Sequence, residues 1–316
     1  MKFKWSLIDK PAIILAPMAN ITTLPFRSIC KEMGADIVFT PMISSNAVIY
    51  NSKETLEIVK FLKEEQPVII QIFGYDGELI AKAANIVNDE LKPAGIDINI
   101  GCPAPKITGN ECGSGLLRDL GRALNLIKIV RNGFSGQLSV KLRLGWSEYN
   151  TLDFTKKLQE IGIDAISVHG RTAKQGYSGK ADWQSIYEIA NTLTIPVIGN
   201  GDITTWEDAK SRLENSKLAG IMIGRGSLGN PWLFKEIREQ KNITKSGKEI
   251  AKIIRVQVER HMKFIGEEKG IREMRKHLGW YIKGFPRAGE LRKQAVLVNT
   301  IQDIENILSQ LELLEN

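Results

Sequence analysis

The sequence has 316 residues, 43% of them hydrophobic and 25% charged, with a formal net charge of +7, and these are ordinary proportions for a soluble globular protein. It contains no run of eighteen apolar residues, and its first ten residues lack the apolar segment of a signal peptide, so it predicts neither a membrane span nor secretion. The three cysteines, Cys30, Cys102 and Cys112, form no C-x-x-C pair and lie near none of the histidines in sequence, so we expect a cytoplasmic location, no metal site and no disulfide framework.

Eight short apolar runs recur along the chain, and the segments between them carry apolar residues at helical spacing, such as Phe154, Leu158 and Ile161. The runs span 12–16, 36–40, 68–73, 96–100, 138–143, 165–169, 196–199 and 219–223. Eight strand–helix units of this length predict a parallel (β/α)8 TIM barrel, an α/β fold that we assign to residues 1–240.

Residues able to bind or react follow seven of these runs, at or just past the point where each run ends. They are Pro17, Met18, Gln71, Asn99, Cys102, Lys141, Arg143, His169, Arg171, Asn200, Asp202, Gly224 and Arg225. The carboxyl ends of barrel strands share one face, where barrel enzymes build their sites. One polar strand end means little, but a set from seven strands predicts a single site at the barrel mouth.

The pattern changes beyond residue 240. A polar stretch at 241–248 reads as a linker, and 250–265, 272–282, 288–298 and 301–314 carry helical patterns, the last opening on a capping box at Thr300. We therefore predict a small all-α domain over residues 241–316. It holds 15 Lys and Arg against 10 Asp and Glu, and 269–293 holds eight against two, so a polyanionic partner is expected.

Two glycine-rich turns follow the seventh and eighth predicted strands. Residues 224–229 read GRGSLG, but no further strand follows, which argues against a Rossmann dinucleotide site. With the GNGD turn at 199–202, they predict the phosphate loops of a barrel, where backbone N–H groups hold an anion; plain tight turns are the alternative. The phosphate site would comprise Asn200, Gly201, Asp202, Gly224 and Arg225.

A phosphate there, with polar residues around the mouth, favours flavin mononucleotide (FMN) as the cofactor. The remaining residues assigned to it are Ala16, Pro17, Met18, Gln71, Lys141 and His169. Lys141 would place positive charge beside the N1–C2 edge, where a reduced flavin is negative, and Gln71 would bond the pyrimidine edge. Alternatively, Lys141 pairs with a neighbouring carboxylate. Gln71 and His169 could likewise make hydrogen bonds that serve only the structure.

The run 96–100 ends in Asn99-Ile100-Gly101-Cys102-Pro103. The glycine allows a sharp turn and the proline fixes φ, so the thiol of Cys102 is presented on a stiff corner. A free cysteine is also often a small buried hydrophobe, and position alone leaves both readings open.

These motifs together resemble the tRNA-dihydrouridine synthase family, in particular its bacterial DusB type. The matching segments are APM at 16–18, PFR at 25–27, NIGCP at 99–103 with Lys106, GSGLL at 113–117, KLRLGW at 141–146, HGRT at 169–172, NGDI at 200–203 and GR at 224–225. Gly115 replaces an expected alanine and Cys112 is unusual in its loop. The resemblance covers nearly the whole chain.

The resemblance implies reduction of a uridine in tRNA to 5,6-dihydrouridine, with FMN as cofactor and NADPH as reductant. Hydride would add at C6 of the uracil, and Cys102, the family's GCP cysteine, would give a proton to C5. Cys112 is an alternative candidate for this acid, and Cys30 is expected in the core. Residues assigned to the substrate are Asn99, Lys106, Arg143 and Arg171 in the barrel and Arg272 and Arg275 in the basic segment. For Arg171, a simple salt bridge is an equal alternative.

Two other functions remain open from the sequence. One is a barrel flavoenzyme acting on a free pyrimidine, like dihydroorotate or dihydropyrimidine dehydrogenases, although a small substrate needs no basic tail. The other is a non-catalytic RNA-binding protein, although Cys102, Lys141 and the phosphate loops argue for catalysis. Trp280 and Tyr281, inside the basic segment, are expected in the helical core, and no protein partner is implied.

Overall fold

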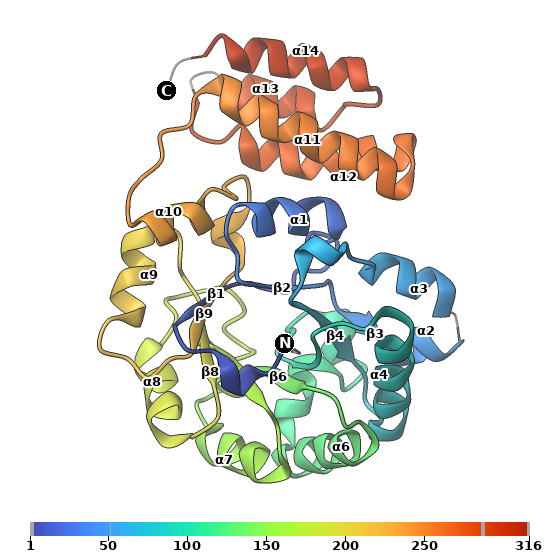
Figure 1. Cartoon of the computed structure of the whole chain (residues 1–316), viewed down its shortest axis with the longest axis vertical. Helices are drawn as coiled ribbons and strands as arrows, with labels where there is room; N and C mark the ends of the chain where they lie inside the picture. Colours follow the sequence, from blue (N-terminus) through green and yellow to red (C-terminus); the bar gives the residue numbers. More distant parts are fainter. Residues whose placement is uncertain (1–2, 51, 286–287, 315–316) are drawn as a thin grey trace.

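The computed structural model describes residues 3–50, 52–285 and 288–314, and its centre is a closed barrel of parallel strands (Figure 1). The barrel strands are β1 (Ala12–Leu15), β2 (Ile37–Phe39), β4 (Val68–Phe73), β5 (Gly95–Ile100), β6 (Leu138–Arg143), β7 (Ala165–His169), β8 (Val197–Asn200) and β9 (Gly220–Ile223). Pairing of β1 with β9 and of β2 with β4 closes the sheet. The predicted TIM barrel is confirmed, and each predicted run agrees with its strand to within one residue at either end.

One short strand was not predicted. β3 (Ile43–Ser44) pairs with the end of β4, with Ile43 opposite Ile72. Two residues are too few to show an alternating pattern, so this strand depends on the neighbour that β4 provides. It continues the place of β2 along β4 toward the carboxyl end of the barrel, next to Met42, which contacts Asn99.

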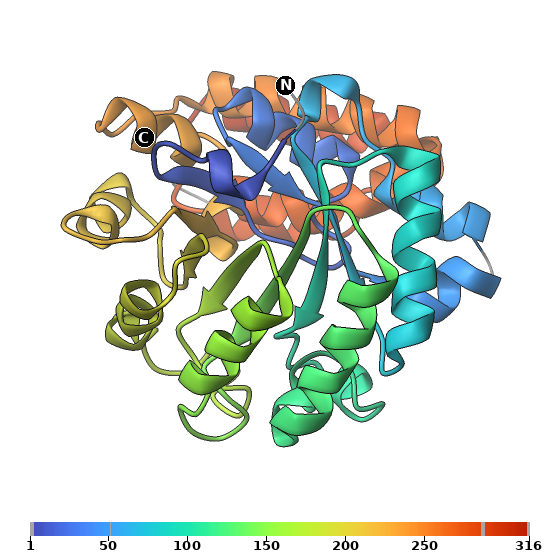
Figure 2. The same ribbon diagram turned by 60° about the horizontal axis from the view of Figure 1, so that its bottom comes forward.

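Helices surround the barrel, and Figure 2 shows strands enclosed by the helical ring. They are α1 (Leu24–Glu32), α2 (Ser45–Tyr50), α3 (Ser52–Val59), α4 (Gly77–Leu91), α5 (Pro105–Thr108), α6 (Leu120–Gly133), α7 (Leu152–Ile161), α8 (Trp183–Thr192), α9 (Trp206–Leu213) and α10 (Leu233–Glu239), with 3₁₀ turns η1 (Trp5–Leu7), η2 (Lys63–Glu65), η3 (Gly113–Arg118) and η4 (Arg225–Ser227). In α4 the spacing buries Ile80, Ala84 and Val87, and Asp76 caps the helix by accepting the Leu79 N–H.

The barrel interior changes character along its axis. Near the amino ends of the strands the inward-facing residues are apolar, including Ala12, Ile37 and Ile69, and the buried ring of Trp5 packs against Phe39. Further along β4 to β8, at the same inward parity, the side chains are Gln71, Asp97, Asn99, Ser139, Lys141, Ser167, His169 and Asn200. One end is therefore filled and dry, and polar groups gather at the other.

The C-terminal helices build a second apolar core. They are α11 (Gly247–Ile265), α12 (Glu267–Tyr281), α13 (Ala288–Ala295) and α14 (Ile301–Glu312). The predicted cap of α14 is confirmed, because the Thr300 hydroxyl accepts the Asp303 N–H and the carboxylate accepts in return. A similar box at Ser246 starts α11 inside the expected linker. Tyr281 is buried as predicted, whereas Trp280 is half-buried.

These helices are docked on the barrel beside α1. Arg260 of α11 donates to the Ser28 hydroxyl at 2.8 Å and forms an ion pair with Glu32 at 2.8 Å. A Cβ on Gly229, in the loop after β9, would lie 2.3 Å from the Trp280 carbonyl oxygen, so this loop and α12 are in close contact. The helical part is thus fixed next to one of the two predicted phosphate loops. No helix in the described ranges is long and apolar enough to cross a membrane.

A buried histidine pair lies in this junction. The His277 ring, 1% exposed, is 5.4 Å from the Phe26 ring of α1 and 5.4 Å from the His261 ring of α11. Burial, with smaller contributions from neighbouring charges, moves the pKa of His277 well below its usual value and outweighs the Gln257 carbonyl to lower the pKa of His261 to about 4. Both rings are therefore neutral in the folded protein at neutral pH.

This burial predicts acid sensitivity of folding. Unfolded histidines take up protons below about pH 6.5 while the folded ones do not, so stability is intact above that pH and falls toward pH 4. We expect the free energy of unfolding to fall by about 1 kcal/mol per pH unit for each of these histidines between pH 6.5 and pH 4. Urea unfolding at pH 7 and pH 5 measures it, and His277→Phe should show a smaller loss than the wild type. Equal losses would contradict this account.

Candidate functional site

A cavity of about 1040 Å³ opens at the carboxyl ends of the barrel strands. It brings together most of the residues that the sequence selected: Ala16, Pro17, Met18, Gln71, Asn99, Cys102, Lys141, Arg143, His169, Asn200, Gly201, Asp202, Gly224 and Arg225. They come from strand ends distributed over residues 16–225, and only barrel closure makes them neighbours. A cavity of this size can accept a cofactor together with a second planar ring.

Four predicted residues lie outside this cavity. Lys106 lines a separate, adjoining cavity of about 430 Å³ between the turn after β5 and the end of β4. Arg171 is buried behind the wall, and Arg272 and Arg275 lie on α12. Their predicted contacts with RNA stay predictions, since the geometry at the barrel mouth does not include them.

The two glycine turns form one side of the cavity. Gly201 has φ of +134°, and a Cβ on Gly226 would lie 2.1 Å from the Ile203 carbonyl oxygen, so these turns require glycine. A Cβ on Gly224 would have no atom closer than 3.6 Å, because this residue borders open space. The backbone of these turns and the half-exposed Arg225 thus line the cavity.

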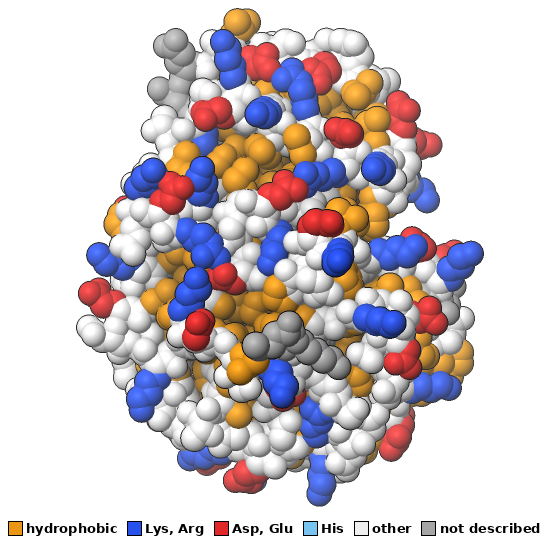
Figure 3. Space-filling view, viewed as in Figure 1, with side chains coloured by type: hydrophobic (Ala, Val, Ile, Leu, Met, Phe, Trp, Pro, Cys, Tyr) orange, Lys and Arg blue, Asp and Glu red, His pale blue; other side chains and the backbone are white. Residues whose placement is uncertain are grey.

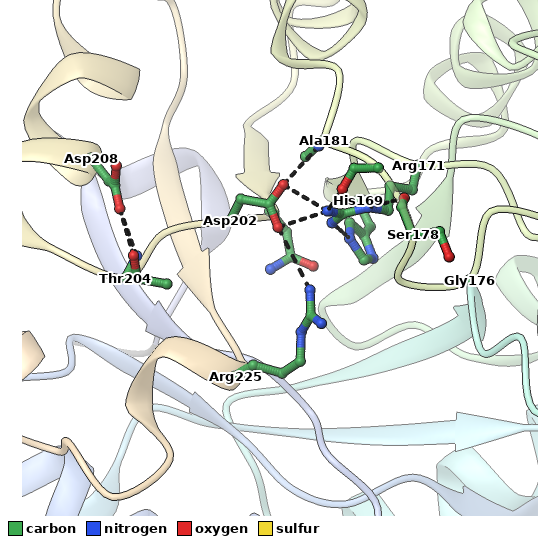
Figure 4. Close-up of polar contacts among 12 residues, drawn as sticks. His169, Arg171, Gly176, Ser178, Ala181, Asp202, Thr204, Asp208 and Arg225 are labelled. Atoms are coloured by element: carbon green, nitrogen blue, oxygen red, sulfur yellow. Dashed lines mark hydrogen bonds and ion pairs between the residues drawn. The ribbon is translucent and has the colours of Figure 1, made fainter. Parts of the chain in front are cut away.

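The Asp202 carboxylate lies between Arg171 and Ala181 on one side and Arg225 on the other (Figure 4). It accepts from Arg171 at 2.8 and 2.7 Å and from the Ala181 N–H at 2.7 Å, and Arg225 lies 3.6 Å away. Burial opposes ionisation, but these donors and charges outweigh it and lower the pKa of Asp202. For Arg171 the structure shows the salt bridge that was the alternative to an RNA contact.

Two arginines hold the loop 171–182 over the cavity. Arg171 also donates to the Ser178 and Gly179 carbonyls, at 3.1 and 2.6 Å (Figure 4). Arg143, 2% exposed, donates to the Gly101 carbonyl at 2.9 Å and, from its other end, to carbonyls at 172 and 176. The turn that carries Cys102 is therefore tied to this loop by one side chain.

Sequence reasoning missed Tyr177, which this loop carries at the cavity rim. Its ring is 58% exposed, and the guanidinium groups of Arg225 and Arg143 lie 4.4 and 5.5 Å from its centre. The flanking Gly176 and Gly179 both have positive φ. An aromatic residue between two loop glycines was the available signal, since such a ring is held out in solvent where a ligand can stack on it.

The basic groups of the cavity have shifted pKa values. Burial, together with repulsion from Arg143, lowers the pKa of Lys141 to about 8, although Asp97 opposes the shift. Its ammonium donates to the Asn200 side-chain oxygen at 3.3 Å. Burial and then the positive charge of Lys141 lower the pKa of His169 to about 2. His169 is therefore neutral, and because Arg171 donates to Nε2 at 3.3 Å, its own proton is on Nδ1.

The thiol of Cys102 borders the cavity on a firmly held turn. The Asn99 side-chain oxygen accepts the N–H groups of Gly101 and Cys102, at 3.0 and 2.9 Å, and Ser114 donates to the Cys102 carbonyl through its N–H and hydroxyl, both at 3.0 Å. All three cysteines are in the described part of the chain, and the other two do not line this cavity. Cys30 is fully buried, as expected, and the Cys112 thiol donates to the Asn110 carbonyl beside the smaller cavity.

Asp97 was also missed. It lies in the middle of β5, is fully buried, and accepts hydrogen bonds from Gln71 and Ser139, both at 2.7 Å. Burial raises the pKa of Asp97 to about 6 against the effect of these donors and of Lys141. A charged residue inside an otherwise apolar strand was visible in the sequence, but the alternation of the run hid its significance.

The fold and the cavity together define a class: a barrel protein whose mouth combines two glycine turns, a buried lysine and a cysteine. No group of three or more candidate ligands for a metal ion occurs among the residues that the structure describes. The sequence model for dihydrouridine synthases matches residues 14–315. The chain belongs to the dihydrouridine synthase family.

Relatives with assigned names agree with this membership. A probable tRNA-dihydrouridine synthase of Aquifex aeolicus is 34% identical over 298 residues, covering 93% of this chain and 94% of that protein. The tRNA-dihydrouridine synthase B of Pseudomonas aeruginosa is 36% identical over 304 residues, covering 93% and 89%. A probable tRNA-dihydrouridine synthase of Rickettsia bellii is 37% identical, covering 91% and 90%.

Solved structures share the fold at low sequence identity. The old yellow enzyme homologue of Zymomonas mobilis superimposes with a TM-score of 0.53 at 14% identity, covering 74% of this chain and 90% of that one. Histamine dehydrogenase from Rhizobium superimposes with a TM-score of 0.56 at 14% identity, covering 77% and 46%. At such identities the likeness establishes the barrel fold and nothing about the ligand.

Proposed function

We propose that the chain reduces a uridine of tRNA to 5,6-dihydrouridine with a bound flavin mononucleotide that NADPH re-reduces. The observation that carries the proposal is one cavity in which the Cys102 thiol, the Lys141 ammonium and two glycine turns meet. Membership in the dihydrouridine synthase family supports the same reaction. NADPH is taken from the family resemblance alone.

The residues present fit a flavin mononucleotide. The turns at Gly201 and Gly224 and the side chain of Arg225 offer donors to a phosphate, and Lys141 offers a desolvated positive charge to the ring. An amide has two N–H groups, so Gln71 keeps one for a ligand after its bond to Asp97. Bound there, the flavin supplies the hydride that adds at C6 of the uracil.

The chain's own residues supply the proton and the fit. Addition at C6 leaves negative charge toward C5 and O4, so a proton must reach C5, and the Cys102 thiol is the acid that lines the cavity. Neutral His169 can donate from Nδ1, and the exposed ring of Tyr177 can stack on a base. The uridine must leave the RNA stack to enter the barrel mouth, at a cost of a few kcal/mol.

The C-terminal helices are proposed to bind the tRNA through phosphate contacts. On the face in Figure 3, Lys and Arg side chains are interspersed with acidic ones over both parts of the molecule. On α12, Arg272 is 63% exposed at its side chain and 3.7 Å from Glu268, whereas Arg275 donates to the Val298 carbonyl and to Asn299. Arg272 is thus the freer of the two to meet a phosphate.

Loss of these charges should lower the salt dependence of tRNA binding. Each phosphate contact contributes close to one unit to the slope of log K against log salt, so Arg272→Ala with Arg275→Ala should lower it by about 1 to 2 units. Binding assays between low and moderate salt measure the slope. The exposed lysines of the barrel helices, replaced in Lys82→Ala with Lys128→Ala, give the matched control. Equal slopes in both double variants would remove α12 from the RNA surface.

Two measurements test the function itself. The visible spectrum after reconstitution with FMN should show flavin bands, and their absence would favour the non-catalytic RNA-binding alternative. Dihydrouridine counted in tRNA from cells lacking the protein should fall at one or more positions. Unchanged dihydrouridine with a bound flavin would favour the free-pyrimidine alternative.

A further inference from the structure

A buried chain of hydrogen bonds joins the barrel interior to the turn that carries the thiol. The Asp97 carboxylate accepts from the Gln71 side-chain nitrogen at 2.7 Å, and the Gln71 oxygen accepts from the Asn99 nitrogen at 2.8 Å. The Asn99 oxygen then accepts the N–H groups of Gly101 and Cys102. Residues from two adjacent strands thus connect a carboxylate to the backbone nitrogen of Cys102.

The donor-to-acceptor direction of this chain of hydrogen bonds is fixed at both ends. A carboxylate only accepts hydrogen bonds, and a backbone N–H only donates, whereas a carboxamide can be turned either way. Facing Asp97, Gln71 must present its nitrogen, so its oxygen faces Asn99. Asn99 must then present its nitrogen to Gln71 and its oxygen to the turn. Each amide therefore has a single orientation in which every member of the chain is satisfied.

Stability alone does not account for these residues. Asp97, Gln71 and Asn99 are 0%, 1% and 6% exposed, in a layer that barrels commonly fill with Val, Ile and Leu. Removing a carboxylate from water costs several kcal/mol, and well-packed apolar side chains often stabilise a fold as much as a buried polar group does. Where a row of buried polar side chains leads to a reactive group, we expect its desolvation cost to be retained for function.

We propose that Asp97 is a positioning residue for the protonation step: it orients Gln71, which orients Asn99, which holds the Cys102 turn against the substrate. The proposal rests on the reaction proposed above. Asp97 itself is enclosed and touches neither substrate nor cofactor in this scheme. Ser139 donates to its other oxygen at 2.7 Å and keeps the carboxylate in place, off the path to the thiol.

The prediction distinguishes the acceptor from the charge. Asp97→Leu keeps the approximate shape but removes the acceptor, so Gln71 and Asn99 lose their fixed orientation and the turn is held less firmly. Asp97→Asn still has an oxygen for Gln71 and can turn its nitrogen to the Ser139 hydroxyl. Ser139→Ala removes one bond to Asp97 and leaves the chain itself intact, which makes it the matched control.

The test uses the full-length, FMN-reconstituted protein and three readouts. They are the alkylation rate of Cys102 by iodoacetamide, followed by peptide mass spectrometry, the single-turnover reduction of tRNA uridine by pre-reduced enzyme, and the rate of flavin reduction by NADPH. For Asp97→Leu we expect uridine reduction to slow by about 10²-fold, the usual effect of a small misplacement of a reacting group, together with a clearly altered alkylation rate. Flavin reduction should slow much less than uridine reduction; some loss is expected because Asp97 also orients Gln71 and supports the charge of Lys141. Asp97→Asn should restore both affected rates, and Ser139→Ala should resemble the wild type.

Two results would overturn the proposal. One is wild-type uridine reduction and alkylation in Asp97→Leu, and the other is an Asp97→Asn variant that folds and binds flavin but is as slow as Asp97→Leu. If Asp97→Leu does not fold, the comparison of Asp97→Asn with Ser139→Ala still decides, because a loss confined to Asp97→Asn would assign the effect to charge. Failure of the wild type to reduce tRNA uridine would instead reject the proposed function. The alkylation rates would still show whether the hydrogen bonds from Asp97 to the Cys102 turn position the thiol.

Discussion

Cys102→Ala is expected to leave flavin binding and its reduction by NADPH intact and to slow dihydrouridine formation by about 10²- to 10⁴-fold, the range typical of losing a general acid. The thiol borders the cavity, but the turn is held by Asn99 and Ser114 through the backbone of residue 102, so alanine preserves the geometry. Stopped-flow measurement of the two half-reactions separates the steps.

The matched control is Cys112→Ala. Cys112 is the rival acid from the sequence, yet its thiol is bonded to the Asn110 carbonyl and lies beside the smaller cavity. Its replacement should leave both half-reactions near the wild-type rate. A normal rate in Cys102→Ala, or a large loss in Cys112→Ala, would reassign the acid.

Lys141→Met is expected to slow the reduction of bound flavin by at least about fivefold, because a desolvated positive charge near developing negative charge contributes on the order of 1–4 kcal/mol. Methionine keeps most of the aliphatic length and removes the charge. The pKa of Lys141 is about 8, so its charge is present below that pH and lost above it. In the wild type the reduction rate should therefore decline as the pH rises through 8, and the variant should lack this decline.

Lys174→Met provides the comparison for that result. Lys174 lines the same cavity but is exposed, so its charge is screened by solvent and should contribute little. If both variants behave alike, or if Lys141→Met shows normal kinetics with an unchanged pH profile, Lys141 has no role in tuning the flavin.

Particular elements show why the fold could be read from the sequence. The strands β4 to β9 are buried on both faces and bounded by turn residues, so their short apolar runs mark them without reference to the rest of the chain. Thr300 caps its helix with Asp303 three residues away, a local interaction that sequence alone contains. The two-residue strand β3 exists only because β4 is beside it, and local patterns could not reveal it.

The sequence predicted most of the residues that line the cavity but not which of them are hydrogen-bonded to each other. Because the carboxyl ends of parallel strands share one face, residues such as Gln71, Cys102 and Lys141 could be assigned to one cavity from the sequence. Their hydrogen-bond partners could not. Asn99 and Arg171 were predicted to contact the substrate, and those contacts stay predictions; the structure adds that Asn99 accepts from the turn at residues 101–102 and that Arg171 pairs with the Asp202 carboxylate.

The sequence by itself determined the alternation of strand and helix, the capped helical tail, and the set of reactive residues at the strand ends, since all of these follow from local periodicity and turn chemistry. Only the tertiary structure decided which of those residues meet. The bond from Asp97 to Gln71 spans 26 positions and the salt bridge from Arg171 to Asp202 spans 31, and such bonds exist only after register and barrel closure bring their strands and loops together.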